Sequence, residues 1–159
     1  MKYENIIEGI FLEQRNRFVA EVLVEGKPAI CHVKNTGRCK ELLVEGATLY
    51  LEDHRQRMGT PKLPFSVIGV IKENARPGEE REGLPPGGLL VNMDSMAPNV
   101  IVEEGLRHGT IRLPGFTAEG MTIQRERTYG RSRLDFYLEE GKRRAYLEVK
   151  GVTLEEGGI

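Results

Sequence analysis

Residues 131–150 read RSRLDFYLEEGKRRAYLEVK, and this stretch decides how the second half of the chain folds. Apolar residues alternate with polar ones on both sides of Gly141-Lys142, a pair that suits a two-residue hairpin loop with glycine in its first central position. Such a loop pairs residue 140 with residue 143 and continues outward, which sets Asp135 directly opposite Glu148. The sequence therefore predicts two facing carboxylates in an antiparallel hairpin.

The facing carboxylates need a neutralising partner, because like charges in opposed positions destabilise a sheet. Mg²⁺ or Mn²⁺ would supply one, with Asp135 and Glu148 as oxygen ligands. Lys150 falls on the same face as Glu148, since side chains alternate with period two. The pattern suits phosphodiester hydrolysis, in which the metal lowers the pKa of a bound water and the lysine orients that water or stabilises charge in the transition state.

A plainer interpretation is a solvated hairpin whose Glu148 and Lys150 are surface charges. Glu-x-Lys occurs by chance in many charged chains, so it depends on its structural context. Upstream, Pro98 fits the first turn of a helix that runs to about Arg107, with Gly109 after its end. Strands are predicted over residues 89–92, 120–128, 132–139 and 144–153. A helix followed by an antiparallel meander indicates an α+β fold.

The first half of the chain predicts a small β-barrel. Residues 17–26 and 28–33 form a predicted hairpin with a turn at Gly26-Lys27, and residues 48–52 and 64–72 look extended. Residues 38–43 can make a short helix. A series of short strands with one brief helix is typical of such a barrel.

Residues 74–88 are charged and rich in proline and glycine, so they can neither bury a face nor hold a ladder of hydrogen bonds. They are predicted to be a linker or loop. The chain then divides into a barrel over residues 1–73 and a second domain over residues 89–159.

Composition excludes several classes of protein. A net charge of −1 argues against a protein that coats nucleic acid by bulk positive charge, so any such binding needs specific patches. No apolar run approaches the roughly 20 residues of a membrane span, and the first residues lack a signal-peptide core, which predicts a cytoplasmic protein. The two cysteines and three histidines have neither disulfide nor zinc-ligand spacing.

The densest basic stretch lies just before the predicted carboxylate site. Arginine suits bidentate phosphate contact, and a tyrosine can stack on a base. The alternative is that these arginines pair with Glu119 and Glu126 on a solvent face. The candidate nucleic-acid contacts of this stretch are Arg125, Arg127, Tyr129, Arg131 and Arg133.

Five blocks of sequence, in order, resemble the sugar fermentation stimulation protein A family. They are residues 14–22 (QRNRFVAEV), 32–42 (HVKNTGRCKEL), 91–99 (VNMDSMAPN), 129–136 (YGRSRLDF) and 147–154 (LEVKGVTL). The resemblance covers nearly the whole chain. Lys34 stands where the family usually has proline, and Gly151 where it often has serine.

The resemblance implies an N-terminal OB-like barrel that binds nucleic acid, DNA above all, and a C-terminal domain like the PD-(D/E)XK nucleases. It also implies a link to the regulation of sugar-utilisation genes. By this match Asp135, Glu148 and Lys150 take the nuclease positions, and Glu104 on the preceding helix is a candidate further metal ligand. The positions where the barrel would meet nucleic acid are Arg15, Arg17, Asn35, Thr36 and Arg38.

The family pattern continues beyond the Glu-x-Lys strand with a further helix and strand, so we expect this chain to be a fragment. The exposed sheet would then favour association with a partner, a second copy included, or disorder near the C-terminus. Two functions besides a nuclease stay open. One is a non-catalytic DNA-binding regulator with a vestigial acidic site, and the other is a small-molecule or protein-interaction module.

Overall fold

The computed structural model describes residues 1–35, 37–56, 63–73 and 88–153. Its first five strands either alternate buried with more exposed side chains or, in the last of them, are buried almost throughout. In β2, for example, Ala20, Val22 and Val24 are buried and the residues between them are partly exposed. This period is that of a strand with one face in a core. The five strands are β1 (Ile6–Asn16), β2 (Val19–Val24), β3 (Lys27–Val33), β4 (Thr48–Asp53) and β5 (Phe65–Lys72).

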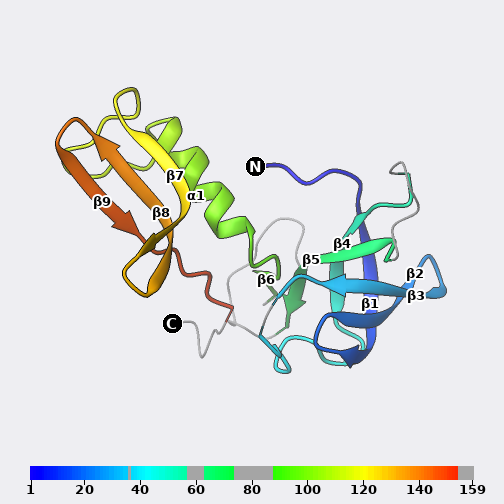
Figure 1. The fold of residues 1–159 in the computed structure, drawn as a ribbon. Coiled ribbons are helices and arrows are strands. Elements are labelled where there is room, and N and C mark those ends of the chain that lie inside the picture. Colours follow the sequence, from blue (N-terminus) through cyan, green and yellow to red (C-terminus); the bar gives the residue numbers. More distant parts are fainter. Residues whose placement is uncertain (36, 57–62, 74–87, 154–159) are drawn as a thin grey trace. The chain divides into compact units, whose positions relative to one another are not determined.

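A parallel pairing closes these strands into a barrel (Figure 1). β1 lies between β2 and β4, β2 pairs with β3, and β4 pairs with β5, all antiparallel. β3 then meets β5 in parallel, with Cys31 opposite Phe65. Closure removes the free edges that an open sheet would present. The predicted OB-like barrel is confirmed, and its fully buried interior includes Val22, Val33, Leu49, Leu51, Val67 and Val70.

The predicted hairpin over residues 17–33 is also present, with its turn one residue earlier than expected. Val24 pairs with Lys27, so Glu25 and Gly26 form the loop. Their φ angles are +51° and +76°. Positive φ at both central residues is the requirement of the tight turn that matches the twist of a hairpin.

Two elements of the barrel differ from the prediction. The longest strand, β1, was not predicted, and its Gly9 lies close to the barrel interior, where a Cβ would come within 2.7 Å of Leu51 Cδ1. The short helix expected over residues 38–43 is wrong. Cys39 has φ +44°, and its carbonyl accepts hydrogen bonds from the amides of both Leu42 and Leu43, so the segment is a turn.

A sixth strand extends the barrel sheet. β6 (Leu89–Asn92) pairs antiparallel with β5, which places it with the barrel and not with the second half of the chain. The compact unit that holds the barrel accordingly runs over Lys2–Ser95 and, of the described residues after it, takes in Val152 and Thr153. We call it the barrel unit. It extends past the boundary at residue 73 that the sequence predicts, because β6 completes the β5 edge.

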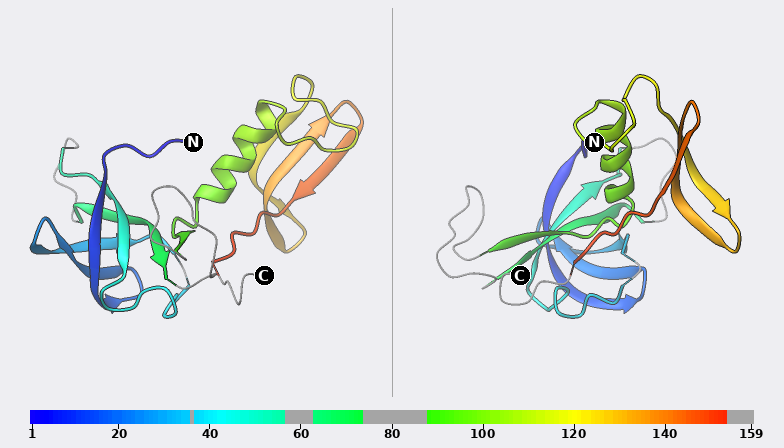
Figure 2. Two further views of the ribbon diagram at one scale, coloured as in Figure 1. Left: turned by 180° about the vertical axis from the view of Figure 1, so that it is seen from behind. Right: turned by 90° about the vertical axis from the view of Figure 1, so that its left-hand side faces the viewer.

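The other compact unit, Met96–Gly151 with Met1, is called the helix–meander unit. It contains α1 (Ala97–Arg107), β7 (Thr122–Tyr129), β8 (Ser132–Glu140) and β9 (Arg143–Leu147). α1 lies along one face of the three-stranded sheet (Figures 1 and 2), where Leu106 packs with Phe136 and Leu138. The predicted helix with Pro98 in its first turn is confirmed. Within the described ranges, no helix is long and apolar enough to cross a membrane.

A network of charged groups lies under the surface of the barrel unit. Lys34 Nζ is 3.2 Å from Glu52 Oε2 and 3.1 Å from Asp94 Oδ2, and these two acids are 8% and 4% exposed. The hydroxyl of Tyr3 donates to Asp94 as well, at 3.2 Å. Burial first and Asp94 second raise the pKa of Tyr3 well above its ordinary value. Buried carboxylates stay ionised at tolerable cost only beside such a cation.

We predict that Lys34→Met destabilises the protein by about 2 to 3 kcal/mol, below the range of a fully buried pair because Lys34 retains some access to water. The reason is that Glu52 and Asp94 would lose their shared countercharge. Urea unfolding measures the change. Lys27→Met, which removes an exposed lysine of β3, is the matched control. Equal stability of the two variants would contradict the role given to Lys34.

The buried thiol of Cys31 makes stability depend on pH. Burial raises its pKa to about 12, against a weaker opposite effect of a hydrogen bond with the backbone of Ala20. A group whose pKa is raised by folding stabilises fully below its unfolded pKa. That stabilisation is lost as pH rises toward the folded pKa, here between about pH 9 and pH 12.

We therefore expect the free energy of unfolding to fall with pH in this window, with Cys31 contributing about 1.4 kcal/mol per pH unit. Cys31→Ala should start from a lower stability and decline less steeply. Denaturant titrations at several alkaline pH values give both slopes. Parallel slopes for the two proteins would show that Cys31 is not responsible.

Candidate metal centre and nucleic-acid interface

The β8–β9 hairpin has the predicted register. Glu140 pairs with Arg143 and Phe136 with Leu147. Gly141 has φ +60°, which is the conformation that glycine adopts at the first central position of a two-residue loop. Asp135 and Glu148 are therefore the next residues along the two arms of the hairpin, one position beyond the pair Phe136 and Leu147.

The strand that carries Glu148 ends sooner than predicted. The expected strand over residues 144–153 stops at Leu147. The amide of Val149, which would otherwise continue the ladder, donates to Asp135 Oδ2 at 2.7 Å. A hydrogen bond to an ionised carboxylate is stronger than one to a backbone carbonyl. The side chain of Asp135 therefore takes the place of a ladder partner and ends β9.

The other oxygen of Asp135 is held by the helix. Asn99, in the first turn of α1, donates its side-chain amide to Asp135 Oδ1 at 3.0 Å. Asp135 thus joins α1, β8 and the segment after β9. Two fixed donors define the orientation of this half-buried carboxylate. Each oxygen still has a second lone pair for a further partner.

Glu148 and Lys150 lie on either side of the amide that Asp135 binds. Their side chains form an ion pair with each other and are both exposed to water. The pKa of Lys150 is raised, first by its hydrogen bond and charge interaction with Glu148 and more weakly by the charge of Asp135. The three predicted catalytic residues are therefore brought into one electrostatic environment.

Glu104, the candidate third acid, is not brought to this group. Its carboxylate pairs with the amino terminus of Met1. Its neighbour Glu103 binds Arg107 and Arg125, and these hydrogen bonds lower the pKa of Glu103 in spite of the raising effect of burial. Among the described residues, no three His, Cys, Asp or Glu side chains are grouped to hold a metal.

Two carboxylates nevertheless form a donor set that suits a hard cation. Mg²⁺ commonly binds proteins through one or two carboxylates and completes its shell with water and substrate phosphate oxygens. Asp135 and Glu148 supply that minimum, and Asp135 is oriented by Asn99. The residues present therefore fit such a cation as ligands to part of its shell.

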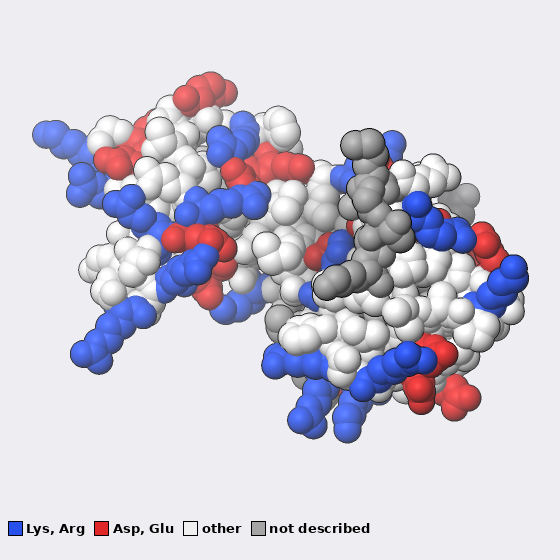
Figure 3. Space-filling model, turned by 45° about the vertical axis from the view of Figure 1, so that its right-hand side comes forward, with Lys and Arg blue, Asp and Glu red and all other residues white. Residues whose placement is uncertain are grey.

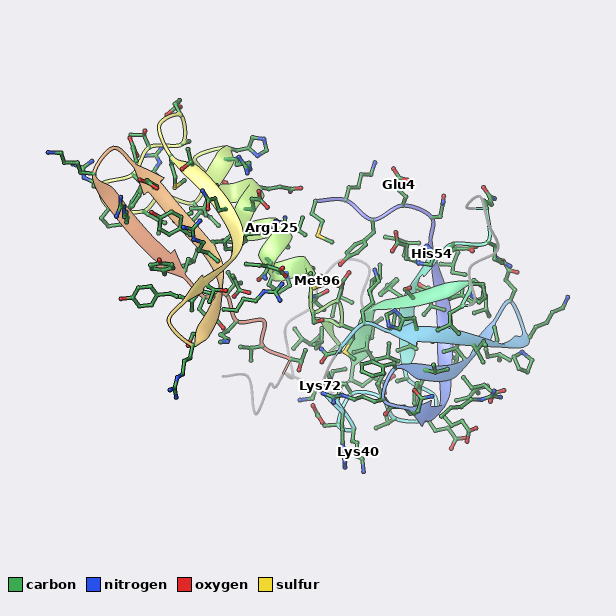
Figure 4. All side chains as sticks on the ribbon, viewed as in Figure 1. Glu4, Lys40, His54, Lys72, Met96 and Arg125 are labelled. Atoms are coloured by element: carbon green, nitrogen blue, oxygen red, sulfur yellow. The ribbon has the colours of Figure 1, made fainter. Side chains whose placement is uncertain are left out.

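The arginines near this group are mostly engaged by other side chains. Arg125, labelled in Figure 4 on β7 beside α1, pairs with Glu103. Arg133 pairs with Glu126, and Arg127 donates to Gln124 at 2.7 Å. Arg131 is exposed in the β7–β8 turn. On the face drawn in Figure 3, basic and acidic side chains are interleaved on both units.

The candidate nucleic-acid contacts on the barrel lie at the turn between β1 and β2 and in the loop after β3. Arg15 pairs with Glu21 at 2.8 Å, and the guanidinium of Arg17 lies over the ring of Phe18. Asn35 accepts a hydrogen bond from the amide of Gly37, which fixes the start of the loop, and Arg38 is exposed within it. Thr36 lies outside the described residues.

Sequence reasoning missed Asn99 and Tyr146. The placement of Asn99 directly after Pro98 put it in the first turn of the predicted helix, but nothing in the pattern indicated that it faces Asp135. Tyr146 pairs with Tyr137 across the hairpin, and the predicted register contained this pairing. What distinguishes this pair from an ordinary structural cross-strand pair is the exposure of Tyr146, which is 40%.

Comparison with known families and proteins assigns both halves of the chain. The profile of the SfsA N-terminal OB domain matches residues 12–76, and that of the sugar fermentation stimulation protein RE domain matches residues 96–159. The solved structure of Pyrococcus furiosus SfsA in complex with Ca²⁺ is similar to this fold, with a TM-score of 0.68 and 23% identity. It aligns with 93% of this chain and 55% of that chain.

Curated relatives match over the whole chain. The sugar fermentation stimulation protein homolog of Desulfitobacterium hafniense (strain DSM 10664 / DCB-2) is 45% identical over 163 residues, which cover 100% of this chain and 60% of the relative. Those of Ruminiclostridium cellulolyticum and Clostridium beijerinckii are 43% and 40% identical, each over 100% of this chain and 61% of the relative. The chain thus spans about three fifths of the length of these relatives, and it belongs to the sugar fermentation stimulation protein family.

Proposed function

We propose that this chain binds nucleic acid, with DNA as the expected ligand, through its barrel and the arginines of its hairpin. We further propose that Asp135, Glu148 and Lys150 cleave the bound nucleic acid with the help of Mg²⁺ or Mn²⁺. One observation carries the catalytic part. Asp135 accepts a hydrogen bond at 2.7 Å from the amide of Val149, the residue between Glu148 and Lys150, so two carboxylates and an ammonium come from neighbouring positions at one end of a hairpin. This is the arrangement of groups that metal-dependent phosphodiester cleavage uses.

The binding part is supported by the barrel. The family model that matches residues 12–76 is described as an OB domain, and OB folds bind single strands through a basic groove and stacking rings. Arg17 beside the ring of Phe18, which is 47% exposed, offers both kinds of contact. Arg38 adds an exposed cation in the loop that Asn35 fixes.

At the hairpin, Asp135 and Glu148 would hold the cation. When bound, it would polarise the phosphate and lower the pKa of a water ligand. Asn99 keeps the Asp135 carboxylate in one orientation. Lys150, exposed and next to Glu148, would orient the attacking water or stabilise charge on the phosphate. The Ca²⁺ in the P. furiosus relative is a cation of the same oxygen-preferring kind.

A second candidate is a non-catalytic DNA-binding regulator, linked to sugar-utilisation genes. It is favoured by the way in which the acids are already engaged. Both oxygens of Asp135 accept hydrogen bonds, Glu148 pairs with Lys150, and Glu104 is paired elsewhere. In this case the carboxylates would stabilise the fold, and their negative charge would influence the position of bound nucleic acid.

The catalytic proposal predicts that Asp135→Asn and Glu148→Gln each lower Mn²⁺-dependent cleavage of single- and double-stranded substrates by about 100-fold or more, since each removes a charged ligand. Asparagine keeps an acceptor for Val149, so Asp135→Asn should fold. Glu119→Gln, at an exposed acid of the same unit, is the matched control. Thermal unfolding of every variant separates loss of activity from loss of structure.

Cleavage that persists in Asp135→Asn at the parent rate would contradict the nuclease proposal. Absence of cleavage in the parent with retained binding would favour the regulator.

The binding proposal predicts a change in salt dependence. The logarithm of affinity falls with the logarithm of salt concentration by about 0.9 per duplex phosphate neutralised. Replacing Arg15, Arg17 and Arg38 together by alanine should weaken binding and make this slope shallower by about one to three. Arg55→Ala is the control, because Arg55 is already paired with Asp53 and Glu25. Fluorescence anisotropy at several salt concentrations measures it, and an unchanged slope would argue against contact by these three residues.

A further inference from the structure

Three tyrosine rings form a row on the sheet of the helix–meander unit. Tyr137 and Tyr146 are directly opposite each other on β8 and β9, with ring centroids 5.1 Å apart. Tyr129, at the end of β7, lies 4.9 Å from Tyr146. We call these three residues the tyrosine row.

Two of the rings are open to water. Tyr129 is 64% exposed and Tyr146 is 40% exposed, whereas Tyr137 is buried. Cross-strand aromatic pairs stabilise a sheet, and this accounts for the contact between Tyr137 and Tyr146. It does not account for Tyr129, which leaves most of its ring outside the packing. An exposed ring that lies between a buried ring and a second exposed ring is instead suited to receive another flat group.

The row is next to the carboxylates. Asp135 is two residues from Tyr137 on β8, and Glu148 is two residues beyond Tyr146. Two residues of a strand span about 6 to 7 Å, close to the spacing between successive nucleotides in an extended strand. A base on the row would therefore have its neighbouring phosphate near Asp135 and Glu148.

The charge of the hairpin fits an anionic partner. Residues 122–150 carry eight Lys and Arg against five Asp and Glu, although the chain as a whole has a net charge of −1. Arg127 places its guanidinium 5.1 Å from the centroid of the Tyr137 ring, at the row itself. Arg131 follows Tyr129 by two residues and is exposed. Aromatic faces and neighbouring guanidinium groups are the two elements with which proteins recognise unpaired bases of any sequence.

We propose that the tyrosine row, with Arg127, is a stacking surface for unpaired nucleobases, so that the hairpin takes single-stranded nucleic acid or the opened end of a duplex. Bases within a duplex are already stacked on each other and cannot offer their faces to a ring. The inference rests on the proposed function and names the substrate class of the same site. It also assigns Tyr146 and Tyr137 a part in binding.

The test compares alanine and phenylalanine variants of Tyr129 and Tyr146. The probes are an oligothymidine single strand and a blunt-ended, fully paired duplex of equal charge, and affinity is measured by anisotropy. Each alanine variant should lose roughly fivefold or more in affinity for the single strand, the lower end of the range for one base stacked on an aromatic ring. Each phenylalanine variant, which keeps the ring, should bind like the parent. Duplex affinity should change little in all four.

A second signal tests ring contact itself. The chain contains five tyrosines and no tryptophan, so its intrinsic emission comes from tyrosine. Stacking of oligothymidine should quench this emission in the parent and quench it less in Tyr129→Ala. Tyr129 is the more exposed of the two open rings, so its alanine variant serves if Tyr146→Ala fails to fold.

The possible failures are distinguishable. If the alanine variants bind the single strand as tightly as the parent while the Arg15, Arg17 and Arg38 variant binds weakly, the row is not a binding surface and the proposed function stands. If single strand and duplex lose affinity equally in the alanine variants, the claim for unpaired bases is overturned. If the parent binds neither probe, the proposed function fails and the row fails with it.

Discussion

The carboxylate of Asp135 accepts a hydrogen bond from the amide of Val149, and the candidate site depends on this one interaction. It ends β9 at Leu147, turns the following chain out of the ladder and leaves Glu148 and Lys150 on either side of the bound amide. Asn99 holds the second oxygen and so ties the first turn of α1 to the same point. A hydrogen bond to a charged group contributes about 1.5 to 3 kcal/mol, enough to favour this course of the chain over one more pair of the ladder.

The barrel unit depends on a comparable constraint. Its closure requires β3 to run parallel to β5, and the chain leaves β3 directly into Lys34, whose ammonium joins Glu52 of β4 to Asp94 after β6. The hydroxyl of Ser95 also donates to the carbonyl of Lys34 at 2.6 Å. The start of the loop at Asn35 is therefore held in place, which suits a loop proposed to contact nucleic acid.

Much of this could be predicted from the sequence, because it follows from local rules. Extended runs of apolar and β-branched residues located four of the five barrel strands, Pro98 and Gly109 bounded α1, and Gly141 fixed the hairpin register that sets Asp135 beside Glu148. The rest depends on contacts between distant residues. β1 contains Gly9, where a Cβ would lie 2.7 Å from Leu51 Cδ1, a contact between residues far apart in the sequence. The end of β9, the pairing of β6 with β5 and the separate pairing of Glu104 are likewise tertiary effects that no short pattern encodes.

The candidate metal centre requires Asp135 and Glu148 to share a divalent cation. Titration of the ¹⁵N-labelled protein with Mn²⁺ tests it most directly, because the paramagnetic ion broadens amide signals near the place where it binds. If the two carboxylates share the ion, the signals of Val149 and its neighbours broaden first, at substoichiometric Mn²⁺, and Asp135→Asn abolishes this effect. Broadening that begins elsewhere, or that is unchanged in Asp135→Asn, would contradict it.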